Sequence, residues 1–368
     1  MSSKYEDELG LIVMDNCKEL GDKIDQNIMQ RRSKKDSFII PTNLVRFNNG
    51  EGKAVIEDSV RDKDLYIISD IGNHSMTYKM YGYINHMGPD EHFMDIKRVI
   101  SAVRGQADRV TVVMPLLYES RQHRRKGRES LDCALALQEL QNLGVSTIVT
   151  FDVHDPNIQN AVPTSMSFEN FYPTNTILKE FIKNEEFDPE TVKFISPDTG
   201  AMDRAKYYAN MFQADVGMFH KRRDYSKIVD GKNPIVAHNY LGGNLEGETA
   251  IVVDDMIAFG TSMLEVAVDL KKRGARKVFL ISTFSMFTNG LECFNKAFEE
   301  GLFEKLYSTN LTYVDKDALT KPWYEQIDCS NYASDIINTL NTSGSISELK
   351  NGKQKILTML QKKKNGEL

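Results

Sequence analysis

Thr249-Ala250-Ile251-Val252-Val253-Asp254-Asp255-Met256-Ile257-Ala258-Phe259-Gly260-Thr261-Ser262-Met263 is the stretch of this chain that decides the fold. In it an apolar run ends in two adjacent carboxylates, and a loop of small residues leads into a helical pattern from Met263. This order predicts a strand, a turn and a helix. Asp254 and Asp255 are then expected at the carboxyl end of a parallel strand, the edge of an open α/β sheet where ligands bind.

The loop Ala258–Ser262 completes the predicted site. It offers backbone N–H groups and two hydroxyls at a helix N-terminus, which suits a phosphate monoester. Carboxylates for sugar hydroxyls and donors for a phosphate, one loop apart, are what a ribose 5-phosphate site requires. The alternative is that the two acids merely cap the surface end of the strand.

Composition narrows the class of protein. The chain has 368 residues, of which 41% are hydrophobic and 27% charged, enough for two domains that each bury a core. The formal charge of −6 argues against a general nucleic-acid or membrane surface, so any anion site must be a local cluster of Arg and Lys. The four cysteines lack metal-ligand spacing and suit a reducing cytosol, and neither a signal peptide nor a membrane-spanning run is evident. We therefore expect a soluble, cytoplasmic protein.

Strand-like and helical runs alternate along the chain, which indicates parallel α/β sheets. The predicted strands are Leu65–Ser69, Val110–Met114, Thr147–Phe151, Lys193–Ile195, Ala250–Val253 and Lys277–Ser282. The predicted helices are Asp90–Val103, Ser130–Leu143, Thr174–Lys183, Met202–Phe212 and Ser262–Arg273. Gly72–Pro89 is interpreted as an irregular excursion, and the Lys-rich end Leu349–Leu368 as a solvated terminal helix. We expect two similar domains, residues 1–165 and 166–345, followed by a tail at 346–368.

A cationic cluster follows the strand Val110–Met114. Five of the eight residues from Arg121 to Arg128 are permanently cationic. The cluster is either a solvated loop or a polyphosphate clamp, and its position after a strand favours the clamp because the planar fork of Arg donates two bonds to phosphate. Arg121 and Gln122 are the preferred contacts.

Two other strand ends carry candidate ligands. Asp152 and His154 project to one side of an extended chain, and His154 is either structural or a ligand of metal or phosphate. Asp198, in Ser196-Pro197-Asp198, is either a helix cap or a carboxylate on Mg²⁺.

A basic triplet, Lys221-Arg222-Arg223, precedes a polar segment with little regular pattern. It is either a solvated surface or a loop whose Lys221 and Arg223 fold over a charged transition state and exclude water. The residues alone do not favour one interpretation.

Taken in order, these blocks resemble the ribose-phosphate pyrophosphokinase (phosphoribosyl diphosphate synthetase) family, from about residue 40 to about residue 345. Single motifs are weak, but six in the family's order are specific. They comprise Arg46–Glu51 with Glu57–Ile68, Arg109–Pro115 with Arg121-Gln122, Asp152–His154, Ser196–Asp198, Lys221–Arg223 and Val253–Ile257. The resemblance implies two type I phosphoribosyltransferase-like domains, with ATP bound by the N-terminal domain and ribose 5-phosphate by the C-terminal one.

The resemblance also implies a role for each matching residue. The implied ATP contacts are Phe47, Asn49 and Glu51, reaching across a subunit interface to the adenine, together with Arg121, Gln122 and His154. The implied magnesium-associated residues are His154 and Asp198, and Lys221 and Arg223 match the mobile catalytic loop. The implied ribose 5-phosphate contacts are Asp254, Asp255, Ala258, Phe259, Gly260, Thr261 and Ser262. An adenine contact from a neighbouring copy implies a homo-oligomer, a dimer or a hexamer.

Several positions depart from the family pattern. His123 stands where Asp is common, Asp155-Pro156-Asn157 differs after His154, and Gly72–Pro89 looks like an insertion. The loop at Ala258–Ser262 is one residue shorter than usual and lacks a third acid, and Phe259 is bulky for a phosphate loop. These changes bear on regulation and substrate affinity.

The resulting hypothesis is diphosphoryl transfer from Mg-ATP to ribose 5-phosphate, giving phosphoribosyl diphosphate and AMP for nucleotide biosynthesis. The short loop also permits a phosphoribosyltransferase that consumes phosphoribosyl diphosphate. His123 and the altered loop permit a third hypothesis, a non-catalytic homologue that regulates an active synthetase, although retention of Lys221 and Arg223 argues against it.

Overall fold

The structure is a computed structural model that describes residue 5 and residues 8–125, 127–223 and 235–368, with the backbone alone at 221–223 and 235–238. Its contacts divide the chain into two compact units. Unit 1 comprises residues 1–173, 310–315 and 328–350, and unit 2 comprises residues 174–309, 316–327 and 351–368. This grouping differs from the expected 1–165, 166–345 and 346–368, because segments late in the chain return to unit 1.

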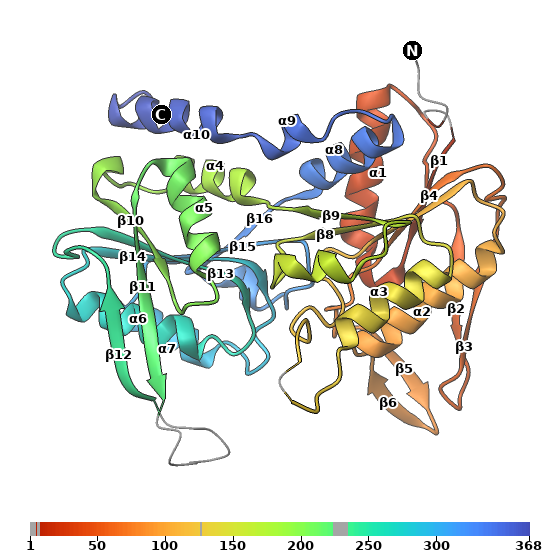
Figure 1. Ribbon diagram of the computed structural model, residues 1–368, viewed down its shortest axis with the longest axis horizontal. Coiled ribbons are helices and arrows are strands. Elements are labelled where there is room, and N and C mark those ends of the chain that lie inside the picture. The colour runs from red at the N-terminus through yellow and green to blue at the C-terminus, as the bar shows by residue number, and fades with distance from the viewer. Residues whose placement is uncertain (1–4, 6–7, 126, 224–234) are drawn as a thin grey trace. The chain divides into compact units, whose positions relative to one another are not determined.

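Unit 1 is built on a five-stranded parallel sheet (Figure 1). Its strand order, β1-β4-β7-β8-β9, follows the chain without reversal. The strands are β1 (Leu9–Val13), β4 (Asp64–Ile68), β7 (Arg109–Val113), β8 (Thr147–Phe151) and β9 (Ser167–Phe171). The helices are α1 (Lys18–Arg32), α2 (Pro89–Val103), α3 (Asp132–Asn142), α8 (Ser330–Asn341) and α9 (Ser347–Lys350).

Helix α8 belongs to unit 1 because it packs against α1. The Arg32 guanidinium donates to Asn338 Oδ1 at 2.8 Å and to Asn341 Oδ1 at 2.7 Å. These contacts join residues more than three hundred positions apart, so no local pattern could have predicted them.

Two antiparallel hairpins extend unit 1 beside α2 (Figure 1). One joins β2 (Thr42–Arg46) to β3 (Gly52–Ile56), and the other joins β5 (Thr77–Met80) to β6 (Tyr83–His86). The second hairpin lies within Gly72–Pro89, so the expectation of an irregular excursion there is wrong. Tyr81 and Gly82 turn this hairpin with φ of 48° and 85°, and positive φ at both turn positions is typical of a two-residue hairpin loop.

Unit 2 is built on a seven-stranded sheet of order β12-β11-β10-β13-β14-β15-β16, in which the β11–β12 pair is antiparallel and the others are parallel. Its strands are β10 (Val192–Ser196), β11 (Asp215–Arg223), β12 (Ile235–Leu241), β13 (Thr249–Ile257), β14 (Lys277–Ser285), β15 (Lys305–Thr309) and β16 (Tyr324–Ile327). Its helices are α4 (Thr174–Asn184), α5 (Met202–Phe212), α6 (Thr261–Lys272), α7 (Glu292–Glu299) and α10 (Lys353–Lys364).

The six predicted strands and five predicted helices are confirmed, with shifts of a few residues at their ends. The central strand β13 is the one that differs most, since it runs on to Ile257 instead of ending at Val253. Pairing with β10 stops at Val252, whereas pairing with β14 continues through Asp254 to Ile257. The two acids therefore lie inside the last part of a strand that has lost one neighbour.

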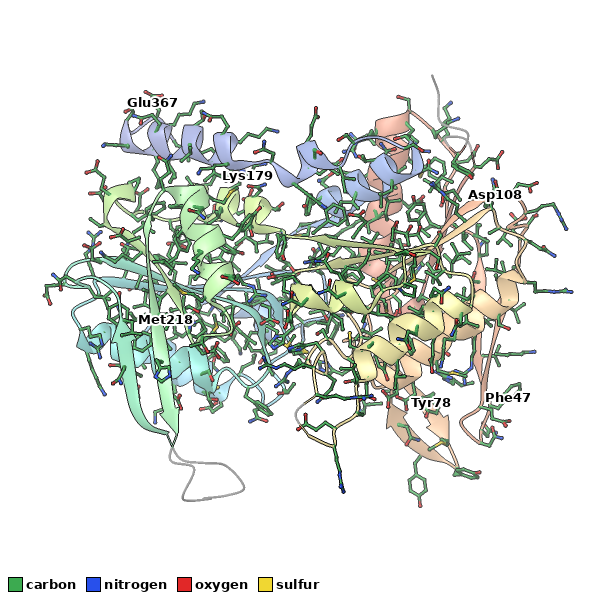
Figure 2. All side chains as sticks on the ribbon, viewed as in Figure 1. Phe47, Tyr78, Asp108, Lys179, Met218 and Glu367 are labelled. Atoms are coloured by element: carbon green, nitrogen blue, oxygen red, sulfur yellow. The ribbon has the colours of Figure 1, made fainter. Side chains whose placement is uncertain are left out.

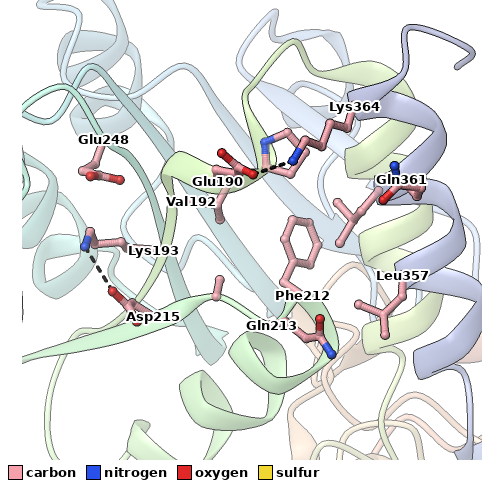
Figure 3. A pocket seen from close by; sticks show the side chains of 13 residues that line it. Glu190, Val192, Lys193, Phe212, Gln213, Asp215, Glu248, Leu357, Gln361 and Lys364 are labelled. Atoms are coloured by element: carbon pink, nitrogen blue, oxygen red, sulfur yellow. Dashed lines mark hydrogen bonds and ion pairs between the residues drawn. The ribbon is translucent and has the colours of Figure 1, made fainter.

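Helix α10 packs on α4 and α5 of unit 2, so the prediction of a solvated terminal helix is wrong for one of its faces. Ile356 and Leu360, four residues apart and thus on one helical face, are buried. The helix borders a cavity of about 480 Å³ (Figure 3), where Lys364 pairs with Glu190 and Lys193 with Asp215. Among the described residues, no helix is both long and apolar enough to cross a membrane.

Substituting Ile356→Ala should therefore destabilise unit 2. Ile356 is completely buried, and truncating such a side chain to alanine costs about 2–4 kcal/mol of unfolding free energy. The measurement is chemical denaturation, with Lys355→Ala, an exposed neighbour, as the matched control. Equal stability of the two variants would mean that α10 does not pack on unit 2.

Candidate functional site

The unit 2 sheet has its topological switch point between β10 and β13. From β10 the chain crosses through α5 to β11 on one side, and from β13 it crosses through α6 to β14 on the other. Ligands of open α/β sheets bind outside the carboxyl ends of the strands at such a point. Asp198 follows β10 there, and Asp254 and Asp255 stand at the same end of β13.

The two adjacent carboxylates differ in burial. The side chain of Asp255 is 3% exposed and that of Asp254 is 23% exposed. Burial, followed by the negative charge of Asp255, raises the pKa of Asp254 well above its ordinary value, and Asp198 acts in the same direction. The three carboxylates are therefore close enough to interact, and they form one anionic centre that favours a cation or hydroxyl donors.

Arg204 is a residue of this candidate site that the sequence analysis missed. It lies in the first turn of α5, 10% exposed, with Nη1 3.8 Å from Asp254 Oδ1 and 3.9 Å from Asp255 Oδ1. Its charge lowers the pKa of Asp254, against the effect of burial. A cation is unfavourable near a helix N-terminus, so an arginine at this position was a signal that another group compensates it.

The predicted phosphate loop joins β13 to α6. Gly260 is the N-cap of α6 with φ of 83°, and a Cβ there would lie 2.2 Å from Cζ of Phe294, so both conformation and space require glycine. No side chain caps this helix start, which leaves the first N–H groups of α6 available to an anion. Phe259 is 47% exposed, and its bulk lies at the surface of the loop.

Asp198 holds the turn that precedes α5. Its Oδ1 accepts from Gly200 N at 2.8 Å and from Ala201 N at 3.2 Å. Asp198 is thus not the N-cap of α5, which is Ala201, and its hydrogen bonds stabilise the turn before the helix instead. The interaction with Asp254 leaves the metal interpretation open. Within the described part of the chain no three His, Cys, Asp or Glu side chains form a ready metal cage. Mg²⁺ does not require one, because it commonly binds one or two carboxylates plus substrate phosphates.

The arm that carries the basic triplet projects from the same edge of the unit 2 sheet. Strand β11 pairs with β10 as far as Met218 and with β12 from Met218 to Arg223. Lys221 and Arg223 therefore sit on a two-stranded extension, in which the register with β12 shifts between Arg222 and Arg223. Their side chains, and residues 224–234, lie outside the part of the chain that the structure describes.

In unit 1 the loops after β7 and β8 meet. His123 Nε2 lies 3.1 Å from a carboxylate oxygen of Asp155, and the rings of His123 and His154 have centroids 5.5 Å apart. Two departures from the family pattern, at positions 123 and 155, thus contact each other. Arg121 and Gln122 precede this contact and are exposed.

The turn between β2 and β3 presents the expected adenine contacts to solvent. Phe47 is 45% exposed, and Asn49 Nδ2 donates to Glu51 Oε2 at 2.9 Å (Figure 2 labels Phe47). A hydrogen bond of 2.8 Å from Phe47 N to Glu51 O closes the turn. The exposed aromatic ring is free to meet another surface, and whether that surface is a neighbouring copy stays a prediction.

The edge of the unit 1 sheet also holds a buried acid, Asp70, which follows β4. It accepts from Thr312 Oγ1 at 2.9 Å and from Tyr313 N at 2.6 Å, and so fixes the returning segment 310–315. Burial raises the pKa of Asp70 to about 6, despite these hydrogen bonds.

Substituting Asp70→Asn should therefore remove a pH dependence of stability. Between pH 3.8 and about 6 the folded state binds the proton more tightly than the unfolded state, so Asp70 contributes more stability as the pH falls. The stability of the wild type relative to the variant should rise by up to about 3 kcal/mol from pH 7 to pH 4. Denaturation at several pH values measures this, with exposed Asp58→Asn as control; a difference that does not vary with pH would contradict it.

Comparisons with known proteins agree with this architecture. Residues 9–144 match the model of the N-terminal domain of ribose phosphate pyrophosphokinase, and residues 174–287 match that of the phosphoribosyl transferase domain. Among curated proteins, ribose-phosphate pyrophosphokinase A of Dictyostelium discoideum is 26% identical over 83% of this chain and 88% of its own. Ribose-phosphate pyrophosphokinase 2 of Schizosaccharomyces pombe is 28% identical, with the same coverage of both chains.

The structural comparison concerns the fold. The phosphoribosylpyrophosphate synthetase of Mycobacterium smegmatis aligns with a TM-score of 0.74 and 20% identity, covering 92% of this chain and all of that one. The parallel sheets, with the acid pair and the following loop at the switch point, define the type I phosphoribosyltransferase fold. The two family matches together span more than half of the chain, which belongs to the ribose-phosphate pyrophosphokinase family of diphosphate-transferring enzymes.

Proposed function

We propose that this chain transfers the diphosphoryl group of ATP to the anomeric hydroxyl of ribose 5-phosphate, giving 5-phosphoribosyl 1-diphosphate and AMP. The hydroxyl oxygen attacks the β-phosphorus, the bond from that phosphorus to the AMP oxygen breaks, and the hydroxyl proton is released. The observation that carries the proposal is the pair Asp254 and Asp255, held beside Arg204 at the switch point of unit 2.

Ribose 5-phosphate would bind at this pair. The carboxylates accept hydrogen bonds from the sugar hydroxyls, and Arg204 limits the protonation of Asp254 that burial promotes. The residues of the loop 258–262 provide N–H groups at the start of α6 for the 5-phosphate. The carboxylate pair and the N–H groups of the loop thus favour a sugar that carries an anionic group at one end.

ATP would bind on unit 1 through Arg121, Gln122 and His154. The exposed turn bearing Phe47, Asn49 and Glu51 would contact the adenine held by a neighbouring copy, so we propose a homo-oligomer, a dimer or a hexamer. A cytoplasmic location remains a prediction.

Mg²⁺ suits the oxygen donors of this chain. Asp198 of unit 2, whose Oδ2 accepts neither of the two hydrogen bonds of the turn, and His154 of unit 1 are each proposed as a magnesium ligand. When bound, the ion neutralises charge on the ATP phosphates. Lys221 and Arg223 would stabilise the charge that develops on the transferred group, and closure of their arm would exclude water.

The experiment is an assay of AMP formation from ATP, with and without ribose 5-phosphate and Mg²⁺. The proposal predicts AMP that depends on both additions and equals the phosphoribosyl diphosphate formed. A phosphoribosyltransferase would instead consume phosphoribosyl diphosphate with a nucleobase and need no ATP. No AMP above background would leave a non-catalytic homologue and contradict the proposal.

A further inference from the structure

A second cavity, of about 240 Å³, lies entirely within unit 1. It sits between the two hairpins, α2 and the segment that follows β1. The residues of its wall that matter here include Met14, Leu44, Arg46, Met76, His92 and Asp95. None of these residues belongs to the ATP or ribose 5-phosphate contacts proposed above.

Part of the wall comes from the segment that looks like an insertion. Met76, Thr77, Tyr78 and Met87 all lie within Gly72–Pro89 (Figure 2 labels Tyr78). Together with Met14 and Leu44 they make an apolar enclosure, and methionine side chains adapt to flat ring systems. The volume exceeds that of a few water molecules and falls below that of pockets for drug-sized ligands. It therefore fits one small ring system.

The charges around the cavity balance. Arg46 Nη2 lies 2.7 Å from Asp95 Oδ2, and Arg98 Nη1 lies 2.6 Å from Asp95 Oδ1. Two cations thus share one buried carboxylate, and Asp15 at the wall supplies the second negative charge. A neutral ligand is favoured over an anion such as phosphate or a nucleotide, because no lining cation lacks a counter-charge. The Arg46 guanidinium is also held 5.4 Å above the ring of Tyr78.

His92 gives the cavity a hydrogen-bond acceptor. The side chain is buried, and its Nε2 lies 2.7 Å from the carbonyl oxygen of Asn73, which can only accept. Nε2 therefore carries the proton, and burial lowers the pKa of His92, so the ring is neutral and Nδ1 keeps a lone pair. Among the described residues, none donates a hydrogen bond to this Nδ1.

We propose that this cavity binds a neutral purine nucleobase. Arg46 gives one N–H group to Asp95 and can donate another to the oxygen of a 6-oxopurine, a ring N–H can donate to Nδ1 of His92, and the methionines cover the faces of the ring. The site differs from the proposed ATP site, which requires cations for a triphosphate.

The cavity also touches the turn that is proposed to contact adenine. Arg46 directly precedes Phe47, and the tip of the second hairpin is bonded to that turn through Tyr81 N and Asn48 O at 2.9 Å. A ligand between the hairpins would fix both of them. This coupling rests on the proposed function, whereas binding itself does not.

The test is calorimetric titration of the full-length protein with hypoxanthine, with ATP and ribose 5-phosphate present and Mg²⁺ removed by EDTA, so that the substrate sites are filled without turnover. One saturable site per chain is expected. His92→Leu, which removes the acceptor at similar size, should weaken binding about 10-fold, as leaving a buried donor unpaired does. Met76→Trp should fill the cavity and abolish binding, and Tyr83→Ser, at an exposed position of the same hairpin, should bind as the wild type does.

Thermal melts establish that each variant is folded. Absence of saturable binding by the wild type, or undiminished binding by both folded cavity variants, would overturn the proposal. Displacement of hypoxanthine by equimolar inorganic phosphate would overturn the preference for a neutral ligand. Hypoxanthine should also alter KM for ATP and leave KM for ribose 5-phosphate unchanged. If KM for ATP does not change, the coupling between the cavity and the turn that bears Phe47 is overturned, and the binding proposal stands. AMP formation is also assayed without purine. AMP formed there would show that the proposed function holds even if hypoxanthine does not bind.

Discussion

Replacing Lys221 with alanine should lower turnover by about 10³-fold or more, as losing a cation does at other sites of phosphoryl transfer. The same loss is expected for Arg223→Ala. Both residues lie on the part of β11 that extends past β10 with β12 as its partner, which puts them beyond the carboxyl edge that carries Asp254. The measurement is single-turnover AMP formation with saturating substrates, so that a defect in binding does not mask the chemical step.

Lys272→Ala is the matched control for this prediction. It removes the same charge from an exposed position at the last residue of α6, far along the chain from the basic triplet, so turnover should stay within a few fold of the wild type. A Lys221→Ala protein with near-normal turnover would remove this arm from the mechanism.

The second large effect is expected for Arg204→Met. Removing this cation leaves Asp254 and Asp255 without the charge that now lies 3.8 and 3.9 Å from them. Removing one partner of a buried charge pair costs about 2–5 kcal/mol, so kcat/KM for ribose 5-phosphate should fall by about 10²-fold. Arg204 acts through the carboxylates and is thus a positioning residue.

The pH profile distinguishes this role from a general loss of structure. Arg204 lowers the pKa of Asp254, so its loss should raise that pKa further and move the acid limb of kcat/KM to higher pH. Arg204→Lys should restore part of the activity and of the profile. Lys206→Met, the same change in charge at an exposed position of the helix, is the control. An acid limb that stays in place would show that Arg204 does not tune Asp254.

The order of strands and helices could be predicted because the apolar periodicity of a parallel α/β sheet is local. Ala250–Val253 and Ser262–Arg273 were located from such patterns, and β13 and α6 confirm them. The end of β13 was misplaced because two charged residues suggest a strand end, whereas pairing with β14 alone carries the strand on to Ile257.

Most of the features that could not be predicted depend on contacts between residues far apart in the sequence. The return of α8 to unit 1 rests on its packing against α1, and no local pattern encodes such a pairing. The hairpin β5–β6 was missed because Tyr81 takes the turn position where Asn or Asp is the usual signal. The contact between His123 and Asp155 joins two positions that the sequence marks only as separate departures from the family pattern.

Transfer of a diphosphoryl group to an intact anomeric oxygen can be tested with one isotope measurement. Ribose 5-phosphate labelled with ¹⁸O at the anomeric hydroxyl is converted with unlabelled ATP, and the products are examined by mass spectrometry and ³¹P NMR. We predict that the label lies in the bridge between C1 and the phosphorus that was the β-phosphorus of ATP, with none in AMP. Unlabelled phosphoribosyl diphosphate, or AMP formed while labelled ribose 5-phosphate remains unconsumed, would contradict this mechanism.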